Sequence, residues 1–479
     1  MNRKNIWVHV ALAFVLVAFA AVIGQIERMR SSLRVHNVRV VRQSDVGQVP
    51  APRLHADRPE VLVRFKPGVS VERISQIARA NNDRLRDEIE SVSGLTVIDD
   101  LDDADPQSVA NQYAAMSDVV AYAEPNATIK LDDPVQGELT RDTVLRNFPG
   151  MPNDPQFTDQ WAHYNRGQDG GKENADISSL KAWETQKGSS DVVVAVLDTG
   201  VDFTHVDLKE NMWIRPENLP EYNDDELGTF NDLNGFNGTD AILDPMDDNG
   251  HGTHCAGIIG AEGDNGEGIA GVNWHVKIMP LKFLGRGGFG STDDAIEAIN
   301  YAIDRKKHGV NIRIISASWG STTNSKALED TIRAAGDAGI LFVAAAGNDG
   351  SDNDRRPHYP SNYDLPNVIS VAALDRSDNL ASFSNFGVKT VHVAAPGKDI
   401  LSTWLNDAYR EASGTSMATP YVSGVAALIV ASQPTISMKD LRAKVLSSVD
   451  KIDSLKGKVE TGGRINAAKA VSKPSETRR

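Results

Sequence analysis

The sequence predicts an α/β fold in which a large three-layer domain, built on a mainly parallel sheet, follows a small α+β domain. The chain has 479 residues, which exceeds one ordinary domain, so two domains are expected. Between residues 154 and 471, continuous runs of valine, isoleucine and alanine alternate with helical segments. Such runs are typical of parallel strands covered on both faces. Nearer the N-terminus, apolar residues alternate with polar ones, as in half-buried strands.

The first 25 residues resemble a targeting segment. Arg3 and Lys4 precede an apolar run from Ile6 to Ile23, which is the order found in secretory signals. The run is also long enough to span a bilayer, so a retained membrane anchor is an equal alternative. Either would export the rest of the chain to a secreted, periplasmic or otherwise extracytoplasmic location. Residues 26–57 are polar without periodicity and are interpreted as a linker.

The small domain is predicted over residues 58–131. Its expected elements are strands at 61–65, 85–89, 95–98 and 119–123, and helices that begin after Ser70 and span 106–116. The order βαββαβ is typical of a small ferredoxin-like α+β domain. Residues 132–153 contain acidic residues, three prolines and two glycines, so we expect an exposed connector where processing proteases cut.

The large domain is predicted over residues 154–473, with a short tail at 474–479. Its expected strands are 192–197, 276–283, 312–318, 340–346 and 368–372, and its expected helices are 292–306, 326–338 and 416–431. In such sheets, active groups gather at the carboxyl ends of the strands.

Composition excludes some functions. The net charge of −15 argues against a nucleic-acid partner, because phosphate binding needs clustered basic residues. The single cysteine, Cys255, cannot form an intrachain disulfide, so core size or a bound metal must supply stability outside the cell. No organic cofactor is expected.

Four short segments carry chemistry. A buried strand ends in Asp198-Thr-Gly, His251 opens a helix of small residues in Asp-Asn-Gly-His-Gly-Thr-His, and Ser416 begins an apolar helix in Ser-Gly-Thr-Ser-Met-Ala. A hydroxyl becomes nucleophilic when an imidazole takes its proton, and a carboxylate holds that imidazole in the required tautomer. Asn348 ends another strand and can donate to a tetrahedral oxygen. Pro420 is expected near the first turn of the serine helix, where a missing N–H costs little.

The order Asp198, His251, Ser416, with Asn348 between the last two, resembles the subtilisin superfamily of serine proteases, including its thermitase- and proteinase K-like members. The resemblance covers residues 154–471 and implies an endopeptidase that acts on proteins or peptides through an acyl-enzyme. The order and the missing Gly-x-Ser-x-Gly elbow argue against an esterase or lipase. An inactive, binding relative is disfavoured because no catalytic position is substituted. His254 and Cys255 are interpreted as structural, and His358 as uninformative.

The resemblance also implies a propeptide and a substrate cleft. Glu60–Gly68 and Val120–Asn126 are similar to the family's inhibitory propeptide, which chaperones folding and then blocks the cleft. Peptide would bind as an added strand between two edges. The matching positions are Gly288, Phe289 and Gly290 on one side and Ser318, Trp319 and Gly320 on the other. The pocket for the residue before the cut bond would be walled by Trp319 with Ala344, Ala345, Ala346 and Gly347, which suggests large apolar or aromatic residues there.

Finally, the resemblance implies a structural calcium ion, as in thermitase-like members. The matching residues are Asp154, Asp207, Gly263, Asn265, Glu267 and Ile269, whose side-chain and carbonyl oxygens suit Ca²⁺. A solvated acidic loop is the alternative. The acidic stretch 223–248 is expected either to bind metal weakly or to be an insertion without metal.

Overall fold

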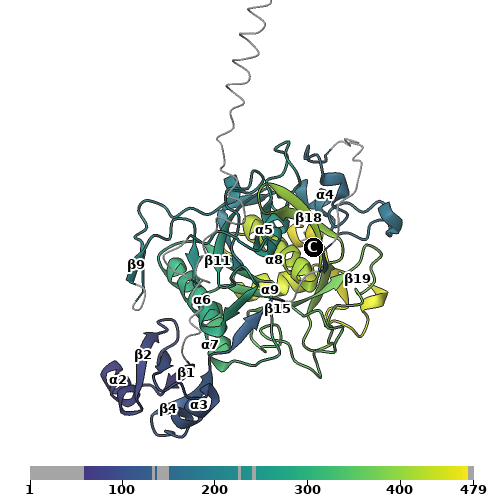
Figure 1. The fold of residues 1–479 in the computed structure, drawn as a ribbon. Coiled ribbons are helices and arrows are strands. Elements are labelled where there is room, and N and C mark those ends of the chain that lie inside the picture. Colours follow the sequence, from purple (N-terminus) through teal and green to yellow (C-terminus); the bar gives the residue numbers. More distant parts are fainter. Residues whose placement is uncertain (1–58, 132–134, 137–149, 225–227, 240–243, 473–479) are drawn as a thin grey trace, which may run out of the picture. The chain divides into compact units, whose positions relative to one another are not determined.

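A computed structural model describes residues 59–131, 135–136, 150–224, 228–239 and 244–472 (Figure 1). The predicted targeting segment, the linker and the tail lie outside these described residues, as does most of the connector.

The small domain has the predicted element order. Its elements are β1 (Glu60–Phe65), α2 (Val71–Ala80), β2 (Asp83–Glu88), β3 (Leu95–Asp100), α3 (Pro106–Ala114) and β4 (Val120–Pro125). The strands form one antiparallel sheet in the order β2-β3-β1-β4. The Ser70 side chain accepts a hydrogen bond from the Arg73 amide and caps α2, as expected.

The two faces of this sheet have different partners. Val61 and Val63 belong to the core that α2 and α3 cover. Leu62 and Val97 point the other way and join a continuous apolar cluster with helices of the large domain. The small domain therefore buries its open sheet face against the large domain.

The large domain is built on a nine-stranded sheet in the order β10-β11-β7-β13-β14-β15-β16-β20-β19. Its strands are β7 (Gly188–Asp198), β10 (Phe236–Asn237), β11 (His275–Lys282), β13 (Ile312–Ala317), β14 (Leu341–Ala345), β15 (Val368–Leu374), β16 (Val393–Pro396), β19 (Val449–Lys451) and β20 (Gly463–Ile465). All neighbours are parallel except β19 and β20. The five predicted strands are the contiguous centre of this sheet, which confirms the predicted fold class.

Alternate residues of β7 show the three layers. Val194 and Val196 pack in the cluster of α5 (His251–Gly260) and α8 (Thr415–Ser432), whereas Ala195 and Leu197 pack in the cluster of α6 (Thr292–Lys307) and α7 (Lys326–Asp337). Helix α8 is long and apolar enough to cross a membrane, but 89% of its most apolar stretch is buried in the protein. It is the central core helix of this domain.

Further elements were not predicted, and most of them are too short to carry a readable period, α9 being the longest. They include β5 (Thr128–Lys130), β6 (Val135–Gln136), β8 (Tyr222–Asp224), β9 (Gly228–Phe230), β12 (Phe289–Ser291), β17 (Ile400–Trp404), β18 (Ala408–Ser413), α4 (Ser179–Trp183), α9 (Met438–Ser447) and α10 (Ala467–Val471), with short 3-10 turns at 157–159, 168–170, 209–211 and 453–455.

Candidate active site

Asp198 and His251 form a buried acid–imidazole pair. Asp198 is the last residue of β7 and His251 is the first residue of α5. Nδ1 of His251 lies 2.7 Å from Oδ1 of Asp198. Burial lowers the pKa of His251, but the Asp198 carboxylate and then Cys255 outweigh it, so the net pKa is well above the ordinary value. Nε2 has no hydrogen-bond partner among the described residues, so it remains available to a reacting group.

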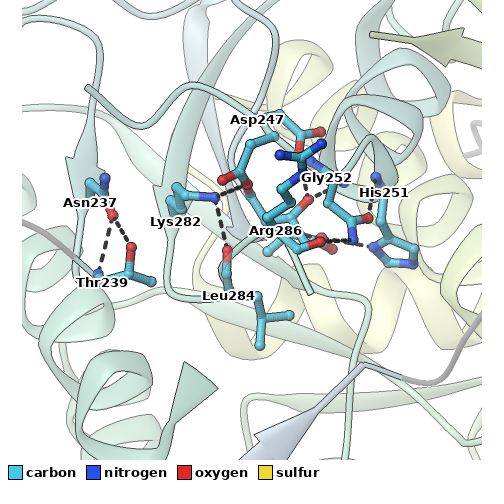
Figure 2. A network of polar contacts seen from close by, with 12 residues as sticks. Asn237, Thr239, Asp247, His251, Gly252, Lys282, Leu284 and Arg286 are labelled. Atoms are coloured by element: carbon cyan, nitrogen blue, oxygen red, sulfur yellow. Dashed lines mark hydrogen bonds and ion pairs between the residues drawn. The ribbon is translucent and has the colours of Figure 1, made fainter. Parts of the chain in front are cut away.

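A second buried carboxylate, Asp247, holds the start of α5 (Figure 2). Its Oδ1 accepts from the Gly250 amide at 3.0 Å and the Thr199 hydroxyl at 2.9 Å, and its Oδ2 accepts from the Thr253 amide at 2.9 Å. The N-cap residue is Gly250, which has no side chain, so Asp247 supplies the cap. Since Thr199 directly follows Asp198, this carboxylate ties both members of the pair together.

Lys282 supports the same loop (Figure 2). Its ammonium, on a side chain only 5% exposed, donates to the Thr199 carbonyl at 2.6 Å, the Leu284 carbonyl at 2.9 Å and the Asp248 carboxylate at 2.7 Å. A buried cation is retained only where acceptors surround it. Neither Asp247 nor Lys282 was predicted from the sequence. Asp247 could have been found, because an acidic residue four positions before His251 is well placed to cap the helix. Lys282 belongs to no motif, so no pattern in the sequence indicates its role.

Ser416 lies in the first turn of α8 and is 1% exposed. Its hydroxyl donates to the Ser318 carbonyl at 2.9 Å. The expectation for Pro420 was wrong, because the helix begins at Thr415 and Pro420 lies in its interior. The missing Pro420 N–H leaves the Ser416 carbonyl free, and the Ser318 hydroxyl donates to it at 2.9 Å. The carbonyl that Pro420 leaves without its helical donor is thus hydrogen-bonded by the residue that follows β13.

Asn348 follows β14 and is half-buried beside the serine. Its Oδ1 accepts from the Thr415 amide at 2.8 Å and from the Thr415 hydroxyl at 3.0 Å. These bonds fix the side-chain amide and leave Nδ2 as the donor next to the N-terminus of α8. That is the group needed at a developing oxyanion.

The small domain occupies one edge of the cleft. Strand β5 pairs antiparallel with β12, with Ile129 opposite Gly290 and Lys130 opposite Phe289. The Leu131 amide extends the ladder and donates to the Gly288 carbonyl at 2.7 Å. Glycines at this edge permit the close backbone approach that an added strand needs.

The opposite edge follows β13. Among the described residues, β5 pairs with β12 alone, so Ser318, Trp319 and Gly320 add no third strand. Trp319 is buried against Phe283, with ring centroids 4.7 Å apart, and lines a small hollow that also contacts Ile129.

Comparison with known proteins identifies the family. The family model described as Peptidase_S8, Subtilase family, matches residues 189–467. The chain belongs to the subtilase family. It is 34% identical to the "Thermophilic serine proteinase" of Bacillus sp. (strain AK1), over 86% of this chain and 87% of that protein. It is 37% identical to "Thermitase" of Thermoactinomyces vulgaris, over 67% of this chain and 99% of that protein.

Solved structures agree on the fold of this subtilase. Fervidolysin from Fervidobacterium pennivorans superposes with a TM-score of 0.68 at 24% identity, over 88% of this chain and 62% of that chain. Together with the family match, this shows a subtilisin-like fold and a subtilisin-type serine peptidase.

The predicted metal residues of the subtilase lie in one place. Asp154 Oδ2 accepts from the Asp264 amide at 2.7 Å, and its Oδ1 is buried without a hydrogen-bond partner in the described part of the chain. Asp207 accepts from the Asn265 amide group at 2.9 Å and from the Ile269 amide at 2.9 Å. Burial raises the pKa of Asp154 to about 7 and that of Asp207 to about 6. Two buried carboxyls and an unsatisfied oxygen fit a hard divalent cation.

Gly263 and Glu267 complete this loop between α5 and β11. The Glu267 amide donates to Asn265 Oδ1 at 2.8 Å, so Asn265 holds a tight turn within the loop. Carbonyls of this loop remain the expected additional ligands of the predicted set.

Other candidates have structural partners. Nε2 of His254 faces the carbonyls of Ile400 and Arg410 at 3.1 and 3.0 Å, and burial lowers its pKa to about 3. In the acidic stretch 223–248, Asp232 pairs with Arg215 at 2.7 Å and with Arg305 at 3.4 Å. These groups need no metal to be satisfied.

Proposed function

We propose that this subtilase is an exported endopeptidase that is made as an inactive precursor and activated by cutting its own chain. The observation that carries this proposal is that β5 and Leu131 lie along the Gly288–Gly290 edge as a substrate strand would. Residues 58–131 would then act as chaperone and inhibitor of the large domain.

Asp198, His251 and Ser416 would perform the reaction. The Ser416 hydroxyl turns from the Ser318 carbonyl to Nε2 of His251, gives up its proton and forms a bond to the substrate carbonyl carbon. The C–N bond breaks as His251 returns the proton to the leaving amine. Water then hydrolyses the acyl-enzyme with the same imidazole as base. Asp198 holds the Nδ1–H and stabilises the imidazolium, consistent with the raised pKa of His251.

Asn348 would stabilise the tetrahedral intermediate. Its Nδ2 and the free amides at the start of α8 converge on the carbonyl of the cut bond. Because Thr415 holds Oδ1, little reorganisation is needed when negative charge develops.

The processing bond would lie between Leu131 and Val135. Leu131 pairs with Gly288 on one side of the nucleophile. Val135 pairs with Ser413, close before Ser416, on the other side. Because Leu131 and Val135 are the described residues nearest to the cut on either side, we expect it in one of the four bonds between them.

Calcium would stabilise the large domain. Asp154, Asp207 and Asn265, with carbonyls of Gly263, Glu267 and Ile269, are the proposed ligands. A bound cation supplies the positive charge that two buried carboxylates lack.

Export rests on the sequence alone. The basic residues and apolar run of residues 1–25 would direct the chain out of the cytoplasm, either as a cleaved signal or as an anchor. N-terminal sequencing of the exported protein, in soluble and membrane fractions, distinguishes the two.

The central test compares the full chain with its Ser416→Ala variant in the presence of calcium. We expect the wild type to shorten by the mass of the propeptide and to digest casein, while Ser416→Ala stays full length and inactive. The C-terminal residue of the released propeptide, read by intact mass, should fall between positions 131 and 134. Equal behaviour of wild type and variant would contradict the proposal.

A further inference from the structure

Two segments flank Ser416 at the carboxyl ends of neighbouring strands. Ser318–Gly320 follows β13, and Ala346–Gly347 follows β14 directly before Asn348. If Asn348 holds the carbonyl of the cut bond, the substrate residue that carries this carbonyl lies against Ser416 and Asn348, and we expect its side chain between the two segments that flank them. The space between the two segments is therefore the pocket for the residue before the cut bond, the S1 pocket.

The imidazole of His358 fills this space. A Cβ added to Gly320 would overlap Cε1 of His358, and a Cβ added to Gly347 would lie 3.0 Å from Cδ2 of the same ring. The ring therefore packs directly on Gly320 and also reaches Gly347, where the Asn385 side-chain amide lies closer to the added Cβ. The ring is 3% exposed and hydrogen-bonds to the Ala345 carbonyl, so it is packed in place.

The ring is neutral under ordinary conditions. Burial lowers the pKa of His358 to about 4, although Asp349 and the Ala345 carbonyl act in the opposite direction. Among the groups that contribute to this pKa, Asp349 is the charged one, so no cation is presented to an acidic substrate residue near neutral pH. The ring therefore affects substrate choice through its size and not through its charge.

We propose that His358 forms the floor of the S1 pocket and restricts this subtilase to substrates with a small or medium residue, such as alanine or leucine, before the cut bond. The inference rests on the proposed peptidase function and names its substrate class. The small residues of the pocket walls had suggested a preference for large apolar or aromatic residues before the cut bond. The proposed preference is the opposite, because the imidazole takes up the space. The sequence gives no signal for His358, because the residue lies outside every motif and reaches the pocket from a later loop.

The test uses peptides that are identical except for alanine, leucine or phenylalanine before the cut bond. We expect the wild type to have a kcat/KM for phenylalanine at least about tenfold below that for leucine, since pocket volume discriminates by about 10–200-fold. In His358→Gly and His358→Ala, kcat/KM for phenylalanine should rise by at least about tenfold while that for alanine changes by less than about threefold. A merely structural role would lower all three together.

His308→Ala is the matched control, because His308 is an exposed histidine remote from the cleft. If the variants fail to fold, the wild type alone tests the inference. Its inactivation rate is then compared between peptidyl chloromethyl ketones that end in alanine and in phenylalanine, and we expect the alanine reagent to be faster. Faster inactivation by the phenylalanine reagent, or equal profiles in wild type and variants, would overturn the inference while leaving the peptidase intact. Absence of hydrolysis and of inactivation would overturn the proposed function itself.

Discussion

Replacing Glu297 by glutamine should weaken the pH dependence with which the small domain is released. Glu297 lies on α6 and is 8% exposed, beneath the sheet face that the small domain buries. It faces Asp87 of β2, with Asp224 and Glu90 nearby. Burial, followed by the Asp87 carboxyl, raises the pKa of Glu297 well above its ordinary value. The docked state therefore keeps a proton that the separated domains would release.

The sign of the effect follows from this difference. A carboxyl whose pKa is raised in the complex stabilises it at low pH, and that stabilisation is lost as pH rises through the raised pKa. Glu60 acts in the same direction, because burial and then Asp293 raise its pKa to about 7 despite the Arg86 guanidinium. Asp293 opposes them: burial raises its pKa, but Arg86 at 2.5 Å outweighs this and the net pKa is lowered.

One linked proton changes the dissociation constant by about tenfold per pH unit between the free and the bound pKa. The Glu297→Gln variant cannot lose this proton, so the slope of log dissociation constant against pH should fall by about one. The assay is the lag before peptide hydrolysis after self-cleavage, measured from pH 5 to 9 with size-exclusion analysis of the complex. The size-exclusion analysis measures dissociation directly, so it does not depend on ionisation of His251.

The control is Glu329→Gln, which changes a surface carboxylate on α7 that pairs with Arg333 at 2.8 Å. It should leave the pH dependence of the lag unchanged. If Glu297→Gln shows the same pH dependence as the wild type, the shared proton does not control docking and the reasoning is refuted.

Three further predictions concern the large domain. Asp154→Asn should abolish stabilisation by calcium, which in the wild type reaches about 2.7 kcal/mol when calcium is in 100-fold excess over its Kd. Calorimetry with calcium or with a chelator measures this stabilisation. In the wild type it should grow between pH 4 and 7, because Asp154 ionises in this range. Asn348→Ala should lower kcat by about 10²–10³-fold with little change in KM, the size known for this donor in subtilisin itself; steady-state kinetics check it, and an unchanged kcat would exclude Asn348 from the oxyanion site. Asp247→Ala should lower the free energy of unfolding by about 2–4 kcal/mol, because it leaves buried amide donors at the start of α5 without an acceptor. Denaturant unfolding measures this change, and the Ser416→Ala background prevents self-digestion.

The sequence was sufficient to predict an element together with its site residue where an apolar pattern and a reactive side chain adjoin in the chain. The buried strand that ends at Asp198 and the helix that begins at Ser416 were both readable, because a run of apolar residues and a functional side chain adjoin in the chain. The nine-stranded sheet order was not readable. Strands of two or three residues such as β10 and β20 have no period of their own and exist only through pairing with neighbours distant in sequence.

The residues that the sequence analysis missed share a physical property: each acts through the backbone of another segment. Asp247 binds the amides of the turn that leads to His251, and Lys282 binds carbonyls at the ends of its own strand and of β7. His358 packs on Gly320 and reaches Gly347, so its effect depends on two residues that carry no side chain at all. A motif search weights side chains that perform chemistry, whereas specificity in this cleft arises from which ring occupies the space that two glycines leave open. Substrate preference in this subtilase should therefore vary with the loop that carries His358 even when Asp198, His251 and Ser416 are unchanged.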